Sequence, residues 1–413
     1  MTHPPDRHRL IVALAFVAFV SLGLPDGLLG VAWPSVRATF GRPVSHLGVL
    51  LAAGTCGYLV SSFLGGQFVR AIGVGPLLLA SSLTVAAALA GIAHAPNWGA
   101  MVGCAVVGGA GGGAVDAGIN TFAASRFSAR VVNWLHACWG IGATTGPVLM
   151  TAVLARGLPW RMGYQVVGVM LVLLSLVFLF TLRLWTITPP TEAGSSTAPA
   201  PTASALEALR RGIVWAQLPL FFLYCGIEYT AGQLLYSLLT EARGMAQAPA
   251  GMATGGYWAS LTVGRVVFGQ VAASVSRRSV LRIGLGLAPL GAAMIWANAG
   301  SAASVAGAAL LGFALAPVFP TLISVTPQRV GAAFAPQAVG FQVAAGNAGI
   351  ALLPGVVGVM ARRLGLEVVG TFLVCATVLL LVLQEVAMRY ADRAVVRQTS
   401  GGIRTCPHPP PIS

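Results

Sequence analysis

Apolar runs of about 20 residues follow one another along most of this chain, and each is long enough to cross a bilayer as a helix. Short polar segments separate the runs. The pattern predicts twelve membrane-spanning helices, at residues 10–33, 46–69, 76–94, 98–122, 132–155, 163–183, 213–237, 251–274, 280–298, 301–325, 336–361 and 367–389. The first run lacks a small-residue cleavage site and leads directly into further spans, so we expect a retained helix and not a signal peptide.

The composition excludes a water-soluble globule. Hydrophobic residues make up 56% of the chain and charged residues 8%, with a mean hydropathy of +0.83. Soluble domains carry about 25% charged residues. We therefore predict an all-α polytopic membrane protein.

Arginine supplies all 24 basic residues, and its distribution predicts an orientation. With the amino terminus inside, sixteen arginines fall on the inner side and seven on the outer side, while Arg265 lies within a span. We expect both termini in the cytoplasm of a bacterium and the protein in its cytoplasmic (inner) membrane. The net charge of +14 does not suggest nucleic acid, because the arginines form no basic face.

A segment rich in Pro, Ala, Ser and Thr divides the chain into two halves of six predicted spans. The expected parts are a first bundle at 1–185, a cytoplasmic linker at 186–211, a second bundle at 212–392 and a flexible tail at 393–413. Similar sequences recur 203 residues apart at Gly66 and Gly269, and 207 residues apart at Gly142 and Gly349. Such offsets predict two duplicated, pseudo-symmetric six-helix bundles.

Three carboxylates interrupt the apolar runs: Asp26, Asp116 and Glu228. An ionised side chain at membrane depth costs at least about 2.5–3.5 kcal/mol, so such residues usually face a water-filled cavity and have a function. Asp26 follows Pro25 and is a candidate proton carrier; alternatively, its carboxyl ties a kink. Asp116 is the second candidate for proton coupling.

Asparagine, histidine and tyrosine near these acids are candidate substrate ligands. Asn120 lies one turn after Asp116 and either binds a hydroxyl or only orients the acid. Glu228, Tyr229 and Gln233 form a polar stripe for hydroxyl recognition; alternatively, Glu228 pairs with a polar group on the eleventh span. His136 either binds substrate or lies at the membrane interface.

Two amides and one arginine complete the polar groups inside the spans. Gln342 and Asn347 suit a polyol, although amides often hold helices together. Arg265 is expected to satisfy helix-end carbonyls at an inner gate. Tyrosine and tryptophan could stack on sugar faces, the candidates being Trp33, Tyr58, Trp139, Tyr236, Tyr257 and Trp258.

Neither a metal site nor a cofactor is expected. The six cysteines are widely separated, with no close pair of the kind that binds zinc. The chain contains no lysine and no GxxxxGK[ST] phosphate loop, so we do not expect ATP-driven transport by this polypeptide.

Twelve helices split six and six resemble the major facilitator superfamily. The segments LPDGLLGVAWPSVRATFG, VDAGINTF and VNWLHACWGIGATTGP resemble the first, fourth and fifth helices of the fucose-permease type of sugar:proton symporters. YCGIEYTAGQLLYSLLTEARG, GYWASLTVGR and FPTLISVTPQRVGAA are similar to helices seven, eight and ten of bacterial relatives.

The resemblance implies proton-coupled uptake of a sugar or polyol by alternating access. The expected partners are the solute, protons and the lipid bilayer, with the monomer as the functional unit. Coupling is expected in the first half and recognition in the second, where Pro317, Phe319 and Pro320 stand in place of an acid matching Asp116. The alternative is proton-driven efflux of an amphipathic compound, because GATTGP partly resembles the antiporter signature of exporters.

The superfamily's gate motif is degenerate in this sequence. GQFVRAIGVG has Arg70 where the family has an acid, and GQVAASVSRR keeps Arg277 and Arg278 but has Ala273 at the acid's position. We expect Gly66, Gly269, Arg277 and Arg278 to serve as gate or structural residues. A charge latch between helix ends must therefore use other partners.

Overall fold

Helices make up nearly all of the chain that the structure describes. The structure is a computed structural model that describes residues 4–185, 204–271 and 274–401. Most of the predicted linker (186–203), the end of the predicted tail (402–413) and Ala273 lie outside these residues.

The first half contains six long helices, which are α1 (Pro4–Thr39), α2 (Leu47–Ile72), α3 (Val74–His94), α4 (Trp98–Arg126), α5 (Ala129–Ala155) and α6 (Trp160–Thr181). Short helical turns η1 (Val44–His46) and η2 (Leu182–Leu184) flank them. The chain reverses between α2 and α3 at Gly73 alone, whose φ of +82° suits a residue without a Cβ. Asn97 caps α4 by accepting a hydrogen bond from the Ala100 N–H.

The second half begins with a short helix, α7 (Ala205–Leu209), capped by Ser204 and Glu207. The others are α8 (Gly212–Ser237), the π-helical turn η3 (Leu238–Ala242), α9 (Gln247–Val271), α10 (Arg277–Trp296), α11 (Ser301–Leu315), α12 (Val318–Val330), η4 (Ala332–Phe334), α13 (Ala335–Leu364) and α14 (Val368–Gly401). Two expectations need correction: residues 205–209 of the predicted flexible linker and 393–401 of the predicted flexible tail are helical.

Eleven stretches of the described chain are helical, long and apolar enough to cross a membrane. They match eleven of the twelve predicted spans. The tenth predicted span corresponds to α11 and α12 together (Ser301–Val330), with Pro317 where the two helices meet. The eighth predicted span corresponds to α9, which has 25 residues, contains Arg265 and is not among the eleven.

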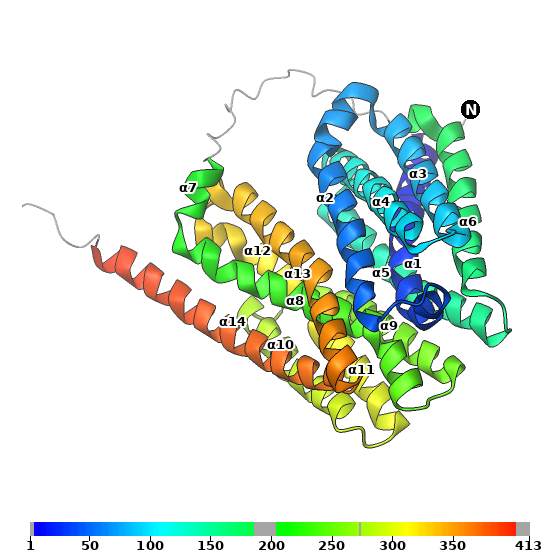
Figure 1. Cartoon of the computed structure of the whole chain (residues 1–413). Helices are drawn as coiled ribbons and strands as arrows, with labels where there is room; N and C mark the ends of the chain where they lie inside the picture. The colour runs from blue at the N-terminus through cyan, green and yellow to red at the C-terminus, as the bar shows by residue number, and fades with distance from the viewer. Residues whose placement is uncertain (1–3, 186–203, 272–273, 402–413) are drawn as a thin grey trace, which may run out of the picture.

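The helices form two groups that lie side by side (Figure 1). In the first helix group (α1–α6), α1 packs on α5, and α4 packs on α2 and α3. In the second helix group (α8–α14), α8 packs on α13, and α11 packs on α9 and α10. Contacts between the groups join α5 with α9, α2 with α13 and α1 with α8.

The same helix contact occurs in both groups. On α4, a Cβ at Gly113 would collide with Tyr58 and Ser61 of α2. On α11, a Cβ at Gly312 would collide with Tyr257 and Ser260 of α9 in the same way. Each pair is 199 residues apart, so this contact aligns the two sequences in space. By this alignment the residue equivalent to Asp116 is Leu315, and not one in the Pro317–Pro320 segment. The second half still has no acid at this position.

We name the two ends of the molecule by their connections. The linker side carries the start of α1, the end of α6 and α7; the distal side carries the turn between α1 and α2 and the loop between η3 and α9 (Figure 1). On the distal side the two groups touch closely: a Cβ at Gly48 of α2 would collide with the backbone of Gly355 of α13. Arg37 of α1 also forms an ion pair with Glu241 of η3.

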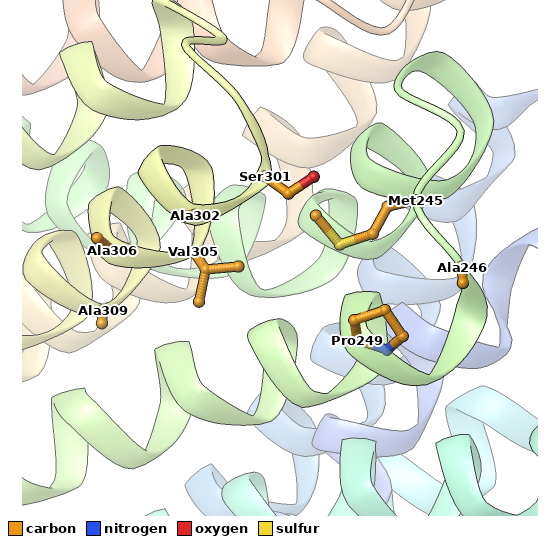
Figure 2. Close-up of a pocket in the computed structure, with 8 residues that line it drawn as sticks. All are labelled: Met245, Ala246, Pro249, Ser301, Ala302, Val305, Ala306 and Ala309. Carbon is orange, nitrogen blue, oxygen red and sulfur yellow. The ribbon is translucent and has the colours of Figure 1, made fainter.

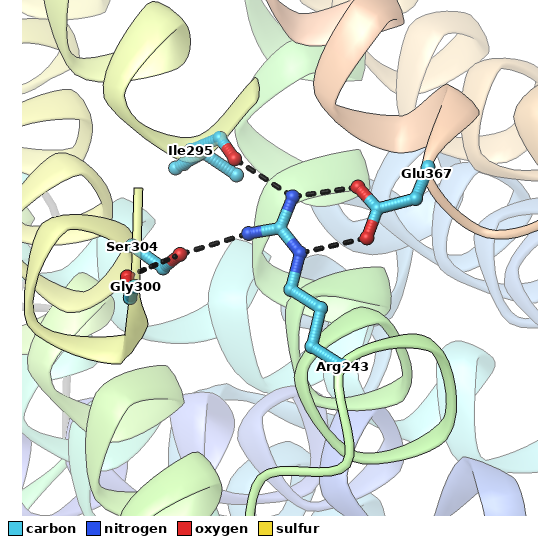
Figure 3. Close-up of polar contacts among 5 residues, drawn as sticks. All are labelled: Arg243, Ile295, Gly300, Ser304 and Glu367. Carbon is cyan, nitrogen blue, oxygen red and sulfur yellow. Dashed lines mark hydrogen bonds and ion pairs between the residues drawn. The ribbon is translucent and has the colours of Figure 1, made fainter. Parts of the chain in front are cut away.

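A second arginine, Arg243, directly follows η3 and ties this part of the chain to other helices of the second group (Figure 3). The Arg243 guanidinium donates to both carboxylate oxygens of Glu367, at 2.9 and 2.6 Å, and to Ser304 and the Ile295 carbonyl at 2.8 Å each. These partners come from the turn just before α14, from α11 and from the end of α10. The turn η3, which carries Glu241, is therefore held in place within the second group.

Candidate functional site

A cavity of about 1320 Å³ lies between the two helix groups and extends into the first one. All three acids predicted from the sequence line it. The acidic, arginine, histidine and amide side chains on its wall are Asp26, Asp116, His136, Glu228, Gln233, Arg265, Gln270, Arg277 and Asn347. This concentration of polar groups inside an apolar protein makes it the candidate functional site.

The cavity opens toward the linker side. Its wall includes Gln270 and Arg277, which are exposed and lie at the linker-side ends of α9 and α10. Exposed Pro320 and Ser324 of α12 also line it on this side. On the distal side the Gly48 and Gly355 contact and the Arg37 and Glu241 ion pair hold the groups together. The structure thus has one accessible and one closed face.

A second hollow, of about 620 Å³, lies on the distal side between the loop before α9 and α11 (Figure 2). Its wall is made of Met, Ala, Pro, Val and Ser side chains, with no ionisable group: Met245, Ala246, Pro249, Ser301, Ala302, Val305, Ala306 and Ala309. Apart from the Ser301 hydroxyl, its side chains are apolar.

Asp26 links the two helix groups. The Tyr229 hydroxyl of α8 donates to Oδ2 of Asp26 at 3.2 Å. The Gln233 side chain, one turn further along α8, donates to the Asp26 backbone carbonyl at 2.8 Å. These two donors come from the second group, while Trp139 of α5, in the first group, also interacts with the Asp26 carboxylate. The sequence did not predict these pairings.

Asp116 has its partners within the first helix group. The Tyr58 hydroxyl of α2 donates to Oδ2 at 2.6 Å, and the Asn120 amide donates to Oδ1 at 2.9 Å. Asn120 does not line the cavity, so the structure favours its second predicted role, which was to orient Asp116. Asp26 and Asp116 line the same cavity but are held by different residues.

Glu228 pairs with arginine and tyrosine inside the second helix group. Its carboxylate accepts a hydrogen bond from Tyr224, one turn earlier, and lies 3.4 Å from Arg265 Nη2 of α9. Its backbone carbonyl accepts the Tyr257 hydroxyl at 2.9 Å. The predicted alternative partner on the eleventh span is therefore wrong, because α9 and α8 itself supply the partners.

Arg265 lies in the cavity wall and not at a helix-end gate, which corrects the expectation from the sequence. Its guanidinium stacks over the Trp139 ring of α5, with Cζ 5.3 Å from the ring centroid. Burial is tolerated because Glu228 balances the charge and the indole face attracts it. Arg265 thereby connects Glu228 to the first helix group.

A group of aromatic rings packs in and behind one wall of the site. Trp258 meets Trp139, Tyr229 and Tyr257 edge-on, with ring centroids 5.8, 5.9 and 5.3 Å apart. Of the six aromatic residues predicted to stack on a sugar, Tyr58 and Trp139 line the cavity. Trp33, Tyr236, Tyr257 and Trp258 are buried behind it.

His136 is exposed, lines the cavity and packs edge-on against Phe19, with ring centroids 5.2 Å apart. Asn347 also lines the cavity and donates to the Val343 carbonyl of its own helix at 3.0 Å.

Gln342 does not lie in the site, which corrects its prediction as a substrate ligand. It is fully buried and hydrogen bonds with Gln217 of α8 and Thr326 of α12. Its amide is satisfied by joining three helices, as is common for polar residues inside membrane bundles.

The predicted gate residues separate into two sets. Gly269 and Arg277 line the linker-side mouth of the cavity, and Arg277 Nη1 lies 3.2 Å from the Gln328 side-chain amide of α12. Gly66 and Arg278 are exposed and do not line it. The charge pair that joins the two helix groups, Arg37 with Glu241, was not predicted and lies at the other side of the molecule.

No cluster of three or more His, Cys, Asp or Glu side chains occurs in the described part of the chain, and the five cysteines within it are free.

Sequence reasoning missed Tyr224 and underrated Tyr58. Tyr224 precedes Glu228 by four residues, a spacing that places two side chains on one helix face, so it could have been found. Tyr58 gave no such signal, because it reaches Asp116 from another helix.

Comparison with known proteins gives the same picture of the fold. A family model described as Major Facilitator Superfamily matches residues 14–246. Membrane protein MosC of Rhizobium meliloti is 30% identical over 149 residues, which span 34% of this chain and 35% of that protein. The match therefore covers about a third of the length of this relative.

Two solved structures share the arrangement of helices. A mutant of the nucleoside transporter NupG superposes with a TM-score of 0.72 at 14% identity, covering 91% of this chain and 98% of that one. A bacterial homologue of the human lysosomal transporter Spinster, in an inward-facing and unoccupied conformation, gives a TM-score of 0.70 at 13% identity, covering 94% and 97%. At these identities the likeness concerns the fold.

Proposed function

This chain belongs to the Major Facilitator Superfamily, and we propose that it moves a sugar or polyol across the membrane together with protons. Members of this family are transporters of small solutes and not enzymes, and the protein is an integral membrane protein. The proposal places both termini in the cytoplasm of a bacterium, with twelve spans in two pseudo-symmetric bundles at 1–185 and 212–392. The monomer would be the functional unit.

The observation that carries the proposal is the placement of Asp26, Asp116 and Glu228 on one cavity with a single accessible face. Carboxylates are expensive at membrane depth, and secondary transporters use them to bind protons and solutes near the bilayer midplane. Here each acid has a hydroxyl or amide donor, so each can be held in place in either protonation state.

We assign proton coupling to Asp116 and Asp26 and solute binding mainly to Glu228, Arg265 and Trp139. Asp116 sits within the first group, while Asp26 is bonded to Tyr229 of the second. Protonation or solute binding that changes the bond between Asp26 and Tyr229 would change how strongly α1 and α8 are held together. The solute and the proton would thus act on the same equilibrium between two states.

The test is uptake into proteoliposomes with and without an imposed proton gradient, using radiolabelled hexoses, pentoses and polyols. We expect accumulation of one of these solutes to depend on the gradient and to be lost in Asp116→Asn. Accumulation that ignores the gradient would contradict proton coupling.

Efflux of an amphipathic compound is the second candidate. It is favoured by the apolar parts of the cavity wall, such as Phe19, Phe268 and Phe319. Deletion in the host separates the two: sensitivity to toxic compounds indicates efflux, whereas loss of growth on one carbon source indicates uptake.

A further inference from the structure

Part of the cavity lies inside the first helix group and not between the groups. We call this part the apolar chamber; its wall includes Val85 and Leu89 of α3, Met101 of α4, and Tyr164 and Leu171 of α6. All five side chains are buried. The second group has nothing comparable among its described residues: α11 and α14 do not line the cavity, and α10 contributes only Arg277 and Val280 near its linker-side end.

One face of α4 connects the chamber with Asp116. Met101, Ala105, Gly108, Gly112 and Asp116 all line the cavity and recur at intervals of three or four residues, which is the spacing of a single helix face. Between Met101 and Val115, a helix length of about 21 Å, the cavity-lining residues of α4 are only Ala and Gly, and Val115 lines the cavity next to Asp116. Along α4, a path lined by nothing larger than a methyl group therefore leads from Val115, beside the proposed proton site, into the chamber.

Gly112 keeps this path open. Its neighbours Gly111 and Gly113 are required by helix contacts, because a Cβ at either would collide with α3 or α2. A Cβ at Gly112 would instead lie 3.8 Å from Leu22 Cδ2, an ordinary contact. Close helix packing thus does not explain this glycine.

In the second helix group, the position equivalent to Gly112 carries a large side chain. The matching contacts of Gly113 and Gly312 align Gly112 with Leu311. Leu311 is fully buried and fills the interior of its group. The chamber exists where the first half has glycine in place of this leucine.

We propose that the apolar chamber binds an apolar group of the transported solute, so that the solute is amphipathic, with a hydroxylated head and an aryl or short alkyl substituent. The head would lie among Asp26, Glu228 and Arg265, and the substituent would pass Gly112. This inference rests on the proposed function and narrows its substrate class. A free sugar would leave the buried apolar wall unfilled, whereas a substituent would gain from its burial.

The test compares methyl and phenyl β-glycosides of glucose, galactose, fucose and xylose by thermal stabilisation of the purified protein. We expect the phenyl derivative of at least one sugar to bind about tenfold more tightly than its methyl derivative, the gain typical of extra apolar contact in a pocket. Gly112→Leu, which copies the second group, and Ala105→Phe, deeper in the chamber, should each reduce this preference to within about twofold.

Gly103→Leu is the matched control. Gly103 lies on the same helix, is exposed, and has no atom within 4 Å of the place that its Cβ would take. It should keep the phenyl preference, which separates filling of the chamber from a general effect of leucine on α4.

The outcomes separate the two proposals. Equal binding of methyl and phenyl glycosides, or a phenyl preference that survives both Gly112→Leu and Ala105→Phe, overturns the proposal that the chamber binds an apolar substituent. The proposal of sugar transport would then still stand. If none of the glycosides and none of the free hexoses, pentoses and polyols stabilises the protein or is transported, the proposed function itself is overturned.

Discussion

Tyr229 and Asp26 join the two helix groups through a hydrogen bond of 3.2 Å across the central cavity. Gln233 reinforces the contact through the Asp26 carbonyl. A proton on Asp26 changes the strength of this bond, since a hydrogen bond to an ionised acceptor is about twice as strong as one to a neutral group. The protonation of one acid is therefore linked to the contact between α1 and α8.

Removing the Tyr229 hydroxyl tests this link. We expect Tyr229→Phe to lower proton-driven accumulation by about tenfold, since hydrogen bonds to charged groups contribute about 1.5–3 kcal/mol. The ring would still pack against Trp258. Tyr236→Phe, on the same helix but outside the cavity wall, is the control and should accumulate solute normally. Equal accumulation by the two variants would show that the bond has no part in coupling.

Asp116→Asn tests the proton site in the first helix group. Asparagine has nearly the same shape and can still bond with Tyr58 and Asn120, but it cannot exchange a proton. We expect gradient-driven accumulation to disappear, while exchange of labelled for unlabelled solute continues and no longer varies with pH. Both rates are measured in proteoliposomes. Loss of exchange as well would indicate a structural role for Asp116.

The pair of Glu228 and Arg265 gives a prediction about stability. Only 6% of the Glu228 side chain and 22% of the Arg265 side chain are exposed. Arg265→Met would leave the acid without its partner, at a cost of about 3–5 kcal/mol in the free energy of unfolding. Adding Glu228→Gln should recover much of this loss. Denaturant unfolding of the wild type, both single variants and the double variant gives the coupling; additive losses would contradict it.

Reversing the charges of Arg37 and Glu241 tests closure of the distal side. The two side chains are 29% and 25% exposed, so the pair contributes at most about 1 kcal/mol, or about fivefold in the population of the closed state. Arg37→Glu should widen the distance distribution between spin labels at positions 158 and 247, and adding Glu241→Arg should restore it. The same reversal of Arg282 and Glu385, both in the second group, should have no effect.

The sequence could predict the helices and the acids of the site for one physical reason. Long apolar runs have no other stable form in a bilayer than helices, and a buried acid is too costly to keep without a polar environment. Asp26, Asp116 and Glu228 accordingly all line the cavity.

The partners of each acid could not be predicted, because they depend on how the helices are rotated. Glu228 and Tyr229 were assigned to one substrate stripe, but consecutive helix residues point about 100° apart. Glu228 therefore turns toward Arg265 in its own group, while Tyr229 reaches Asp26 in the other. Gln342 shows the opposite error. It was predicted to bind the solute, but its buried amide forms hydrogen bonds with Gln217 and Thr326 on other helices.

The register of the two halves was similarly only approximate. Offsets of 203 and 207 residues came from α2 with α9 and from α5 with α13, whereas the contacts of α4 on α2 and of α11 on α9 give 199. The sequence match of Gly66 with Gly269 is therefore four residues, about one helix turn, away from the structural register of the same two helices. For this reason the predicted counterpart of Asp116 was displaced from Leu315 to the proline-rich segment that follows.

The closed distal side has an unusual surface where Gly48 meets Gly355. Neither helix has a side chain at the crossing, and nearby Gly358 lies against Ser45 in the same way. Interlocking side chains would have to be pulled out of one another before two helices could part. Two glycine surfaces have no interdigitated side chains, so one helix can rotate on the other and move away without any side chain changing its rotamer first. Opening this side should therefore be fast, with its equilibrium governed by a few polar contacts at the rim.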